Sequence, residues 1–132
     1  MSALSLIAAL ARVGKMTYSK PENFHIKVRI YNKEIAFGKG VAQLLRLTES
    51  FGSLSAAYKE MGMSSSKAWK ILHRAEQDLG YALITSSSGG RDGGGSCLTP
   101  EGRELLERYD AFECEVQRQA RDAFRKYFAG EN

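Results

Sequence analysis

A run of hydroxyl and basic side chains between residues 64 and 74 has the types and spacing suited to binding a polyanion. Three serines are followed by cations at helical spacing: Ser64, Ser65, Ser66, Lys67, Lys70, His73 and Arg74. Small hydroxyl groups allow close approach to base edges and can bind phosphate. Lysine and arginine further along reach guanine edges or the phosphate backbone. The pattern predicts a nucleic-acid-reading face, although taken alone it is also that of an ordinary solvated helix.

The elements that would position these side chains form a helix-turn-helix pattern. The expected helix 64–79 carries apolar residues at spacings of 4, 3 and 4 on its other side, at Ala68, Leu72, Ala75 and Leu79. A shorter helix precedes it, with Ser53 as its expected cap, and Gly62 lies in the turn. Two short helices joined by a tight glycine-containing turn are typical of this motif. Ser53 therefore joins the expected DNA-binding residues.

A further helix is expected before this pair, from about Lys39 to Phe51, and Gly52 ends it at a C′-type position. Before it, residues 24–31 alternate apolar and polar side chains, which predicts a strand with a basic outer face. Residues 1–16 are expected to form a short amphipathic helix rather than a signal peptide, because no basic segment precedes the apolar one.

The glycine-rich segment 86–98 is expected to be the wing of the motif. Strand-like residues flank it, at 81–85 and at 96–98. A phosphate-binding loop would need a lysine after the glycines and a helix directly behind it. A flexible linker is the other alternative, but order resumes at once with the helix start Thr99-Pro100. We expect a hairpin whose tip residue, Arg91, contacts the minor groove or the DNA backbone.

Trp69 and His73 need separate interpretation. Trp69 lies one residue off the apolar side of its helix, and packing against the wing strands is the commoner fate of such a side chain. We expect Trp69 there rather than at the DNA edge. No carboxylate or nucleophile pattern accompanies His73, so it is expected on the surface, as a phosphate contact rather than a catalytic base.

The last helix, residues 100–128, carries a near-heptad apolar stripe: Leu105, Tyr109, Phe112, Val116, Ala120, Ala123 and Tyr127. At 1.5 Å per residue it is about 40 Å long, more than a winged-helix core can cover. We expect it to pair with the same helix of a second copy, and folding back onto its own domain is the alternative. A two-fold dimer would place two reading helices about 34 Å apart, which suits a palindromic site.

Composition is compatible with a single structural unit. The 132 residues are expected to divide into a winged helix-turn-helix with an N-terminal helix over 1–99 and a dimerisation helix over 100–132. Residues 1–99 carry 13 basic and 7 acidic side chains, an excess of six, whereas residues 100–132 carry 6 and 8. The positive charge thus lies with the expected DNA-binding part, as counterion release requires. The fold class is mostly α (α+β).

Other function classes find little support. Cys97 and Cys114 have no CxxC partner or nearby histidine pair, so we expect reduced cysteines, a cytoplasmic protein, no metal and no cofactor. No apolar run approaches the roughly 20 residues that span a bilayer, so no membrane partner is expected. No nucleophile is paired with a base, and we expect no enzyme activity.

The chain also resembles a known family. The segments Leu54-Ser55-Ala56-Ala57 and Leu98-Thr99-Pro100-Glu101-Gly102 are similar to those of the N-terminal winged helix of LysR-type regulators. Lys67-Ala68-Trp69 and the glycine wing 89–95 resemble more closely the molybdate-responsive ModE-type regulators. The resemblance covers about residues 24–128. It implies a homodimer that binds double-stranded DNA. By residue match, the resemblance places in the major groove Ser64, Ser65, Ser66, Lys67 and Lys70, and at the minor groove or backbone Arg91.

That family carries C-terminal small β-barrels that bind the oxyanion, whereas this sequence stops at Asn132 after the long helix. We therefore expect that this chain binds no molybdate. The main interpretation is a dimeric, cytoplasmic, bacterial transcriptional regulator that reads a palindrome with helix 64–79 and wing 86–98. The alternative is a winged-helix module that acts through contact with a partner protein.

Overall fold

The computed structural model describes residues 2–3, 18–86 and 95–129, which belong to two compact units. One unit runs from Lys27 to Phe112, and the other joins the residues before it to those after it. The elements are α2 (Lys39–Phe51), α3 (Leu54–Glu60), α4 (Ser65–Leu79), β1 (Ile84–Ser86), β2 (Ser96–Leu98), α5 (Pro100–Phe124) and the π-helical turn η1 (Arg125–Ala129). The expected mostly α winged-helix class is confirmed. The boundary between the two units lies within α5, after Phe112.

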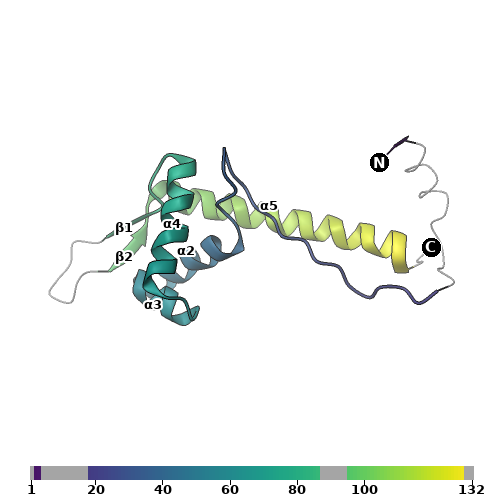
Figure 1. Cartoon of the computed structure of the whole chain (residues 1–132), viewed down its shortest axis with the longest axis horizontal. Coiled ribbons are helices and arrows are strands. Elements are labelled where there is room, and N and C mark those ends of the chain that lie inside the picture. Colours follow the sequence, from purple (N-terminus) through teal and green to yellow (C-terminus); the bar gives the residue numbers. More distant parts are fainter. Residues whose placement is uncertain (1, 4–17, 87–94, 130–132) are drawn as a thin grey trace. The chain divides into compact units, whose positions relative to one another are not determined.

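The helix ends lie where local sequence chemistry predicted them. Ser53 Oγ accepts a hydrogen bond of 3.1 Å from the Ala56 amide at the start of α3. Ser64 Oγ accepts one of 3.2 Å from the Lys67 amide at the start of α4. Gly52 and Gly80 end α2 and α4 with φ of +67° and +88°, a left-handed conformation that glycine adopts without steric cost. Figure 1 shows α2, α3 and α4 gathered beside the two strands.

The two strands of the expected wing pair antiparallel, with Ile84 opposite Leu98 and Ser86 opposite Ser96. The Ser96 amide donates to the Gly52 carbonyl oxygen at 2.9 Å, which ties β2 to the end of α2. Thr99 caps α5, since its Oγ1 accepts from the Gly102 amide at 2.9 Å. Strand β1 is shorter than the segment 81–85 suggested and begins at Ile84. The loop 87–94 and most of the expected helix 1–16 lie outside the described residues.

The strand expected at residues 24–31 is wrong. Only Ile30 takes part in pairing, through an isolated antiparallel bridge with Phe37 in which its amide donates to the Phe37 carbonyl at 2.9 Å. The apolar alternation has another cause: Val28 and Ile30 pack against the helical core. The turn that follows is held by Asp78 of α4, whose carboxylate accepts from the amides of residues 32–34.

The core of the Lys27–Phe112 unit contains Tyr109, which we expected at a dimer interface. Its side chain is 4% exposed, its ring lies 5.1 Å from that of Phe37, and its hydroxyl donates to the Val28 carbonyl at 2.7 Å. Leu105 also packs against this core. The first half of α5 therefore uses its apolar side within its own unit. The other buried core residues are Val41, Ala42, Leu44, Leu45, Leu54, Ala57, Ala68, Leu72, Ala75, Leu83, Leu98 and Leu106.

In the other unit, an extended segment packs on the second half of α5. The rings of Phe24 and Phe124 lie 5.2 Å apart, and Phe128 continues the aromatic group at 5.1 Å from Phe124. The side-chain amide of Gln117 donates to the Ile26 carbonyl at 3.0 Å. The apolar side of this part of α5 is thus partly covered by the chain's own residues. Among the described residues, no helix has the length and apolar character needed to cross a membrane.

Candidate nucleic-acid interface

Helix α4 separates its buried and exposed sides as the sequence predicted. Ala68, Leu72 and Ala75 are buried against α2 and α3. The predicted reading residues all lie on the exposed side of the helix or at its start: Ser64, Ser65, Ser66, Lys67, Lys70, His73 and Arg74. One element thus presents hydroxyl groups at its amino end and cations along its length, because the apolar positions hold the opposite side in the core.

The lysines and the arginine of this face are not paired with neighbouring carboxylates. Within the described ranges, Lys67, Lys70 and Arg74 form no ion pair. Elsewhere in the same unit, Arg46 pairs with Asp110 at 2.6 Å and Arg103 with Glu49 at 2.9 Å. Unpaired cations on one helix face produce a positive potential that attracts phosphate.

The four serines predicted to bind DNA have two different structural roles. Ser53 and Ser64 each use a hydroxyl oxygen as a helix cap, and these oxygens lie 3.1 Å and 3.4 Å from those of Ser55 and Ser66. Each cap hydroxyl also carries a hydrogen that can be donated to phosphate. Ser65 and Ser66 occupy the exposed first turn of α4. Ser53 and Ser64 therefore position the helices, and Ser65 and Ser66 present the first turn.

Trp69 does not close the core against the wing strands, and that prediction is wrong. The side chain is 41% exposed and stacks on His73, with ring centroids 5.3 Å apart and planes 22° from parallel. His73 Nδ1 in turn lies 3.3 Å from Glu76 Oε1, and Glu76 Oε2 accepts from the Leu83 amide at 2.7 Å. The core at this level is filled by Ala68 and Leu72, which leaves the indole on the exposed side of α4.

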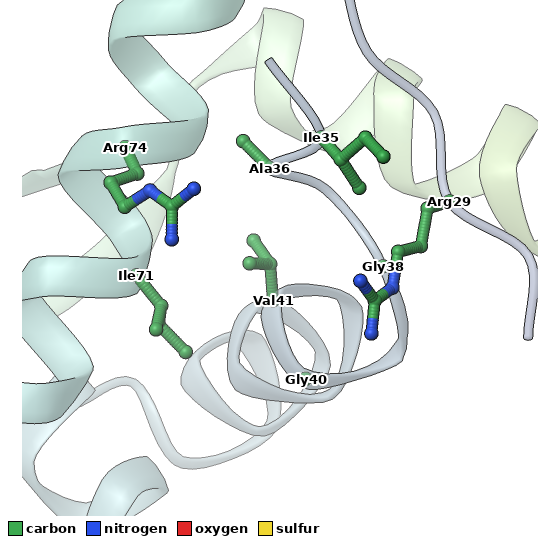
Figure 2. Close-up of a pocket in the computed structure, with 8 residues that line it drawn as sticks. All are labelled: Arg29, Ile35, Ala36, Gly38, Gly40, Val41, Ile71 and Arg74. Carbon is green, nitrogen blue, oxygen red and sulfur yellow. The ribbon is translucent and has the colours of Figure 1, made fainter.

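A shallow pocket beside α4 contains an arginine that the sequence analysis did not single out. Arg29 and Arg74 lie on opposite sides of it, with the first turn of α2 between them, as Figure 2 shows. The pocket has a volume of about 160 Å³ and is also lined by Ile35, Ala36, Gly38, Gly40, Val41 and Ile71. The alternation of basic residues over 27–31 was the signal that could have identified Arg29.

Of the expected wing, the structure describes the two strands but not the loop between them. Arg91 lies outside the described residues, so only the strands that would carry the wing are described. Over residues 2–3, 18–86 and 95–129, no group of three or more histidine, cysteine, aspartate or glutamate side chains could hold a metal ion. Both cysteines are free and exposed.

Known proteins resemble this chain over part of its length. The molybdenum-pterin-binding protein MopB of Rhodobacter capsulatus is 40% identical over 65 residues, which are 49% of this chain and 24% of that protein. The DNA-binding transcriptional dual regulator ModE of Escherichia coli K12 is 29% identical over 97 residues, 74% of this chain and 36% of the relative. The molybdenum transport protein ModE of Azotobacter vinelandii is 35% identical over 75 residues, which are 57% of this chain and 28% of that protein.

Two of these relatives carry the name ModE and the third is named for molybdenum-pterin binding, and the resemblance to ModE-type proteins is confirmed. No family model matches the chain. The matched segments make up about a quarter to a third of the length of these relatives.

Proposed function

We propose that this chain is a DNA-binding transcriptional regulator without enzymatic activity. The observation that supports this most is the exposed face of α4, where Lys67, Lys70 and Arg74 form no ion pair with any described residue and follow a first turn of serines. The relative from Escherichia coli is named a DNA-binding transcriptional regulator, which favours the same activity here. In the bound complex, α4 lies in the major groove with its first turn nearest the bases.

The wing completes the contact with DNA in this proposal. Strands β1 and β2 extend from the end of α4 and from the start of α5 respectively. The loop between them carries Arg91, which contacts the minor groove or the backbone. Replacement of Arg91 by alanine should weaken binding, with a smaller effect on sequence preference than a change in α4.

The protein acts as a homodimer on a palindromic site, with the two copies paired through α5. The support is the heptad-like spacing along this helix, together with Phe112, which is 51% exposed. Tyr109 is left out of the interface, because it is buried in its own unit, and so is Leu105, which is partly buried against the same core. The interface therefore comprises Phe112, Val116, Ala120, Ala123 and Tyr127.

The experiment that tests the proposal is selection of bound fragments from genomic DNA, followed by affinity measurement over a range of salt. The affinity should fall steeply as salt rises, and the bound fragments should share a palindrome with fixed half-site spacing. Lys70→Ala should weaken binding about tenfold if the lysine contacts a base edge or a phosphate. Arg121→Ala, which also removes one positive charge, from an exposed position on α5, is the control and should leave affinity nearly unchanged.

The opposite result has a clear meaning. If the folded protein binds mixed DNA fragments at low salt no better than serum albumin does, it is not a DNA-binding regulator. The partner-protein interpretation would then replace it.

A further inference from the structure

The pocket beside α4 lies over the start of α2, and this start offers free amides. Gly38 is the N-cap residue and has no side chain to satisfy them. The first intrahelical bond runs from the Ala42 amide to the Gly38 carbonyl at 3.0 Å, so the amides of residues 39–41 have no acceptor within the helix. The first turn of α2 contains no acidic residue. The positive end of the helix dipole is therefore not compensated by its own side chains.

The two arginines of the pocket are exceptions among the arginines of the described segments. Most of the others form an ion pair, on Arg46, Arg103, Arg108, Arg118 and Arg125. Arg29 and Arg74 form none with any described residue, and both line this pocket, whose lining contains no carboxylate. Two unpaired guanidinium groups in one pocket favour the binding of an anion with several acceptor oxygens.

Gly38 allows Arg29 to reach this position. A Cβ built on Gly38 would lie 3.2 Å from Arg29 Cγ, a tight contact that the bare glycine avoids. The aliphatic stem of Arg29 therefore lies against the backbone of Gly38 at the start of α2, and its guanidinium lines the pocket. Figure 2 shows this guanidinium and that of Arg74 on the two sides of Val41.

We propose that this pocket binds a phosphate group between Arg29, Arg74 and the first amides of α2, and that in the complex it is a phosphate of the DNA backbone. The inference rests on the proposed function, because the DNA arm of the test requires a DNA-binding protein. Ile71 and Arg74 come from α4, so a phosphate in the pocket lies directly beside the reading face. A small free oxyanion has the same chemistry, and the experiment separates the two sources.

The diagnostic variant is Arg29→Ala, because Arg29 lies outside the reading helix. Its affinity for DNA should fall about fivefold for specific and mixed sequences alike, and the slope of log affinity against log salt should decrease by about one. Arg121→Ala is the matched control, since Arg121 is an exposed arginine on α5 with no ion pair to a described residue. Gly38→Ala should act in the same direction as Arg29→Ala, because the new methyl group displaces the Arg29 stem. Circular dichroism establishes that each variant is folded.

The DNA measurements separate failure of the phosphate-pocket proposal from failure of the proposed DNA-binding function. If the wild type and Arg29→Ala bind DNA with the same affinity and salt slope while Lys70→Ala weakens binding, the pocket is not a DNA-phosphate site and the function stands. If the wild type binds no DNA, the function fails, and so does the DNA-phosphate assignment. Titration with inorganic phosphate, followed by the amide resonances of residues 39–41, then decides the rest. Shifts of these resonances in the wild type that disappear in Arg29→Ala support a free-oxyanion site. If the wild type shows no shifts, the proposal that the pocket binds phosphate is wrong.

Discussion

The carbonyl oxygen of Leu83 lies so close to Gly102 that a Cβ built on the glycine would be 2.3 Å away. The first turn of α5 therefore packs directly on the backbone just before β1. The Thr99 amide donates to the same carbonyl at 3.0 Å, and Thr99 Oγ1 donates to the Ala82 carbonyl at 2.7 Å. This junction connects the start of the last helix to the base of the two-strand sheet.

Gly102→Ala should destabilise the protein, because the added methyl group clashes with backbone that cannot rotate away. Overpacking of this kind typically costs about 1–3 kcal/mol, and we expect the free energy of unfolding to fall by about 2 kcal/mol. Urea denaturation measures the change. Gly40→Ala is the control, since its Cβ would meet nothing within 4 Å, and its stability should be unchanged or higher. Equal stabilities for the two variants would contradict the close packing.

Asp78 should make stability depend on pH in the acid range. Its carboxylate accepts hydrogen bonds of 2.7, 2.8 and 2.9 Å from the amides of Asn32, Lys33 and Glu34. These bonds, the one from Asn32 first, lower the pKa of Asp78 below its ordinary value of 3.8. Because the folded pKa is below the unfolded one, the stabilisation is complete above the unfolded pKa and is lost as pH falls through the folded pKa.

The variant Asp78→Asn tests this relationship. It should be less stable than the wild type at neutral pH, and the difference in stability should narrow at an acid pH below the ordinary pKa of 3.8, as the wild-type carboxyl becomes protonated. Thermal unfolding at both pH values gives the comparison. Asp110→Asn, which removes one partner of the exposed pair with Arg46, should cost little at either pH. A stability difference for Asp78→Asn that stays constant with pH would argue against the proposed role of its charge.

Trp69 should report DNA binding by its fluorescence. It is the single tryptophan of the chain, and it lies exposed on α4 among the proposed DNA contacts. Addition of DNA should change its emission, because the indole loses water contact in the groove. Trp69→Ala should weaken DNA binding about fivefold or more, since stacking and burial at an interface are lost. Its unfolding midpoint should change little, because the side chain lies outside the core. A large loss of stability would instead place the indole within the core.

Phe112 should control assembly through α5. Phe112→Asp places a charge in the proposed apolar interface, and we expect the dimer dissociation constant to rise at least about tenfold. Sedimentation equilibrium measures it, and affinity for a palindromic site should fall in parallel while affinity for a half-site is retained. Glu107→Ala, an exposed change on the same helix, is the control. A wild-type protein that is monomeric at all concentrations would refute the dimer. The Phe112→Asp substitution would then leave the molecular mass in solution unchanged.

The helices and their ends were predictable because their causes are local. The caps Ser53 and Ser64 bond amides three residues ahead, and Gly52 and Gly80 end their helices by their own backbone conformation. The apolar spacing of α4 likewise depends on residues within four positions of one another. The exposed side of α4 followed from that spacing, because the buried side of a helix determines which side remains exposed.

Contacts between distant residues decided the rest. Tyr109 belongs to the core because its hydroxyl meets the Val28 carbonyl, 81 residues away. Asp78 holds a turn 44 to 46 residues before it, and of residues 24–31 only Ile30 forms a bridge, with Phe37. Arg29 becomes part of a pocket only because the chain folds back over Gly38 and α4 brings Arg74 to the other side. Sequence spacing reveals which residues share a face, whereas what that face meets depends on segments that only folding brings together.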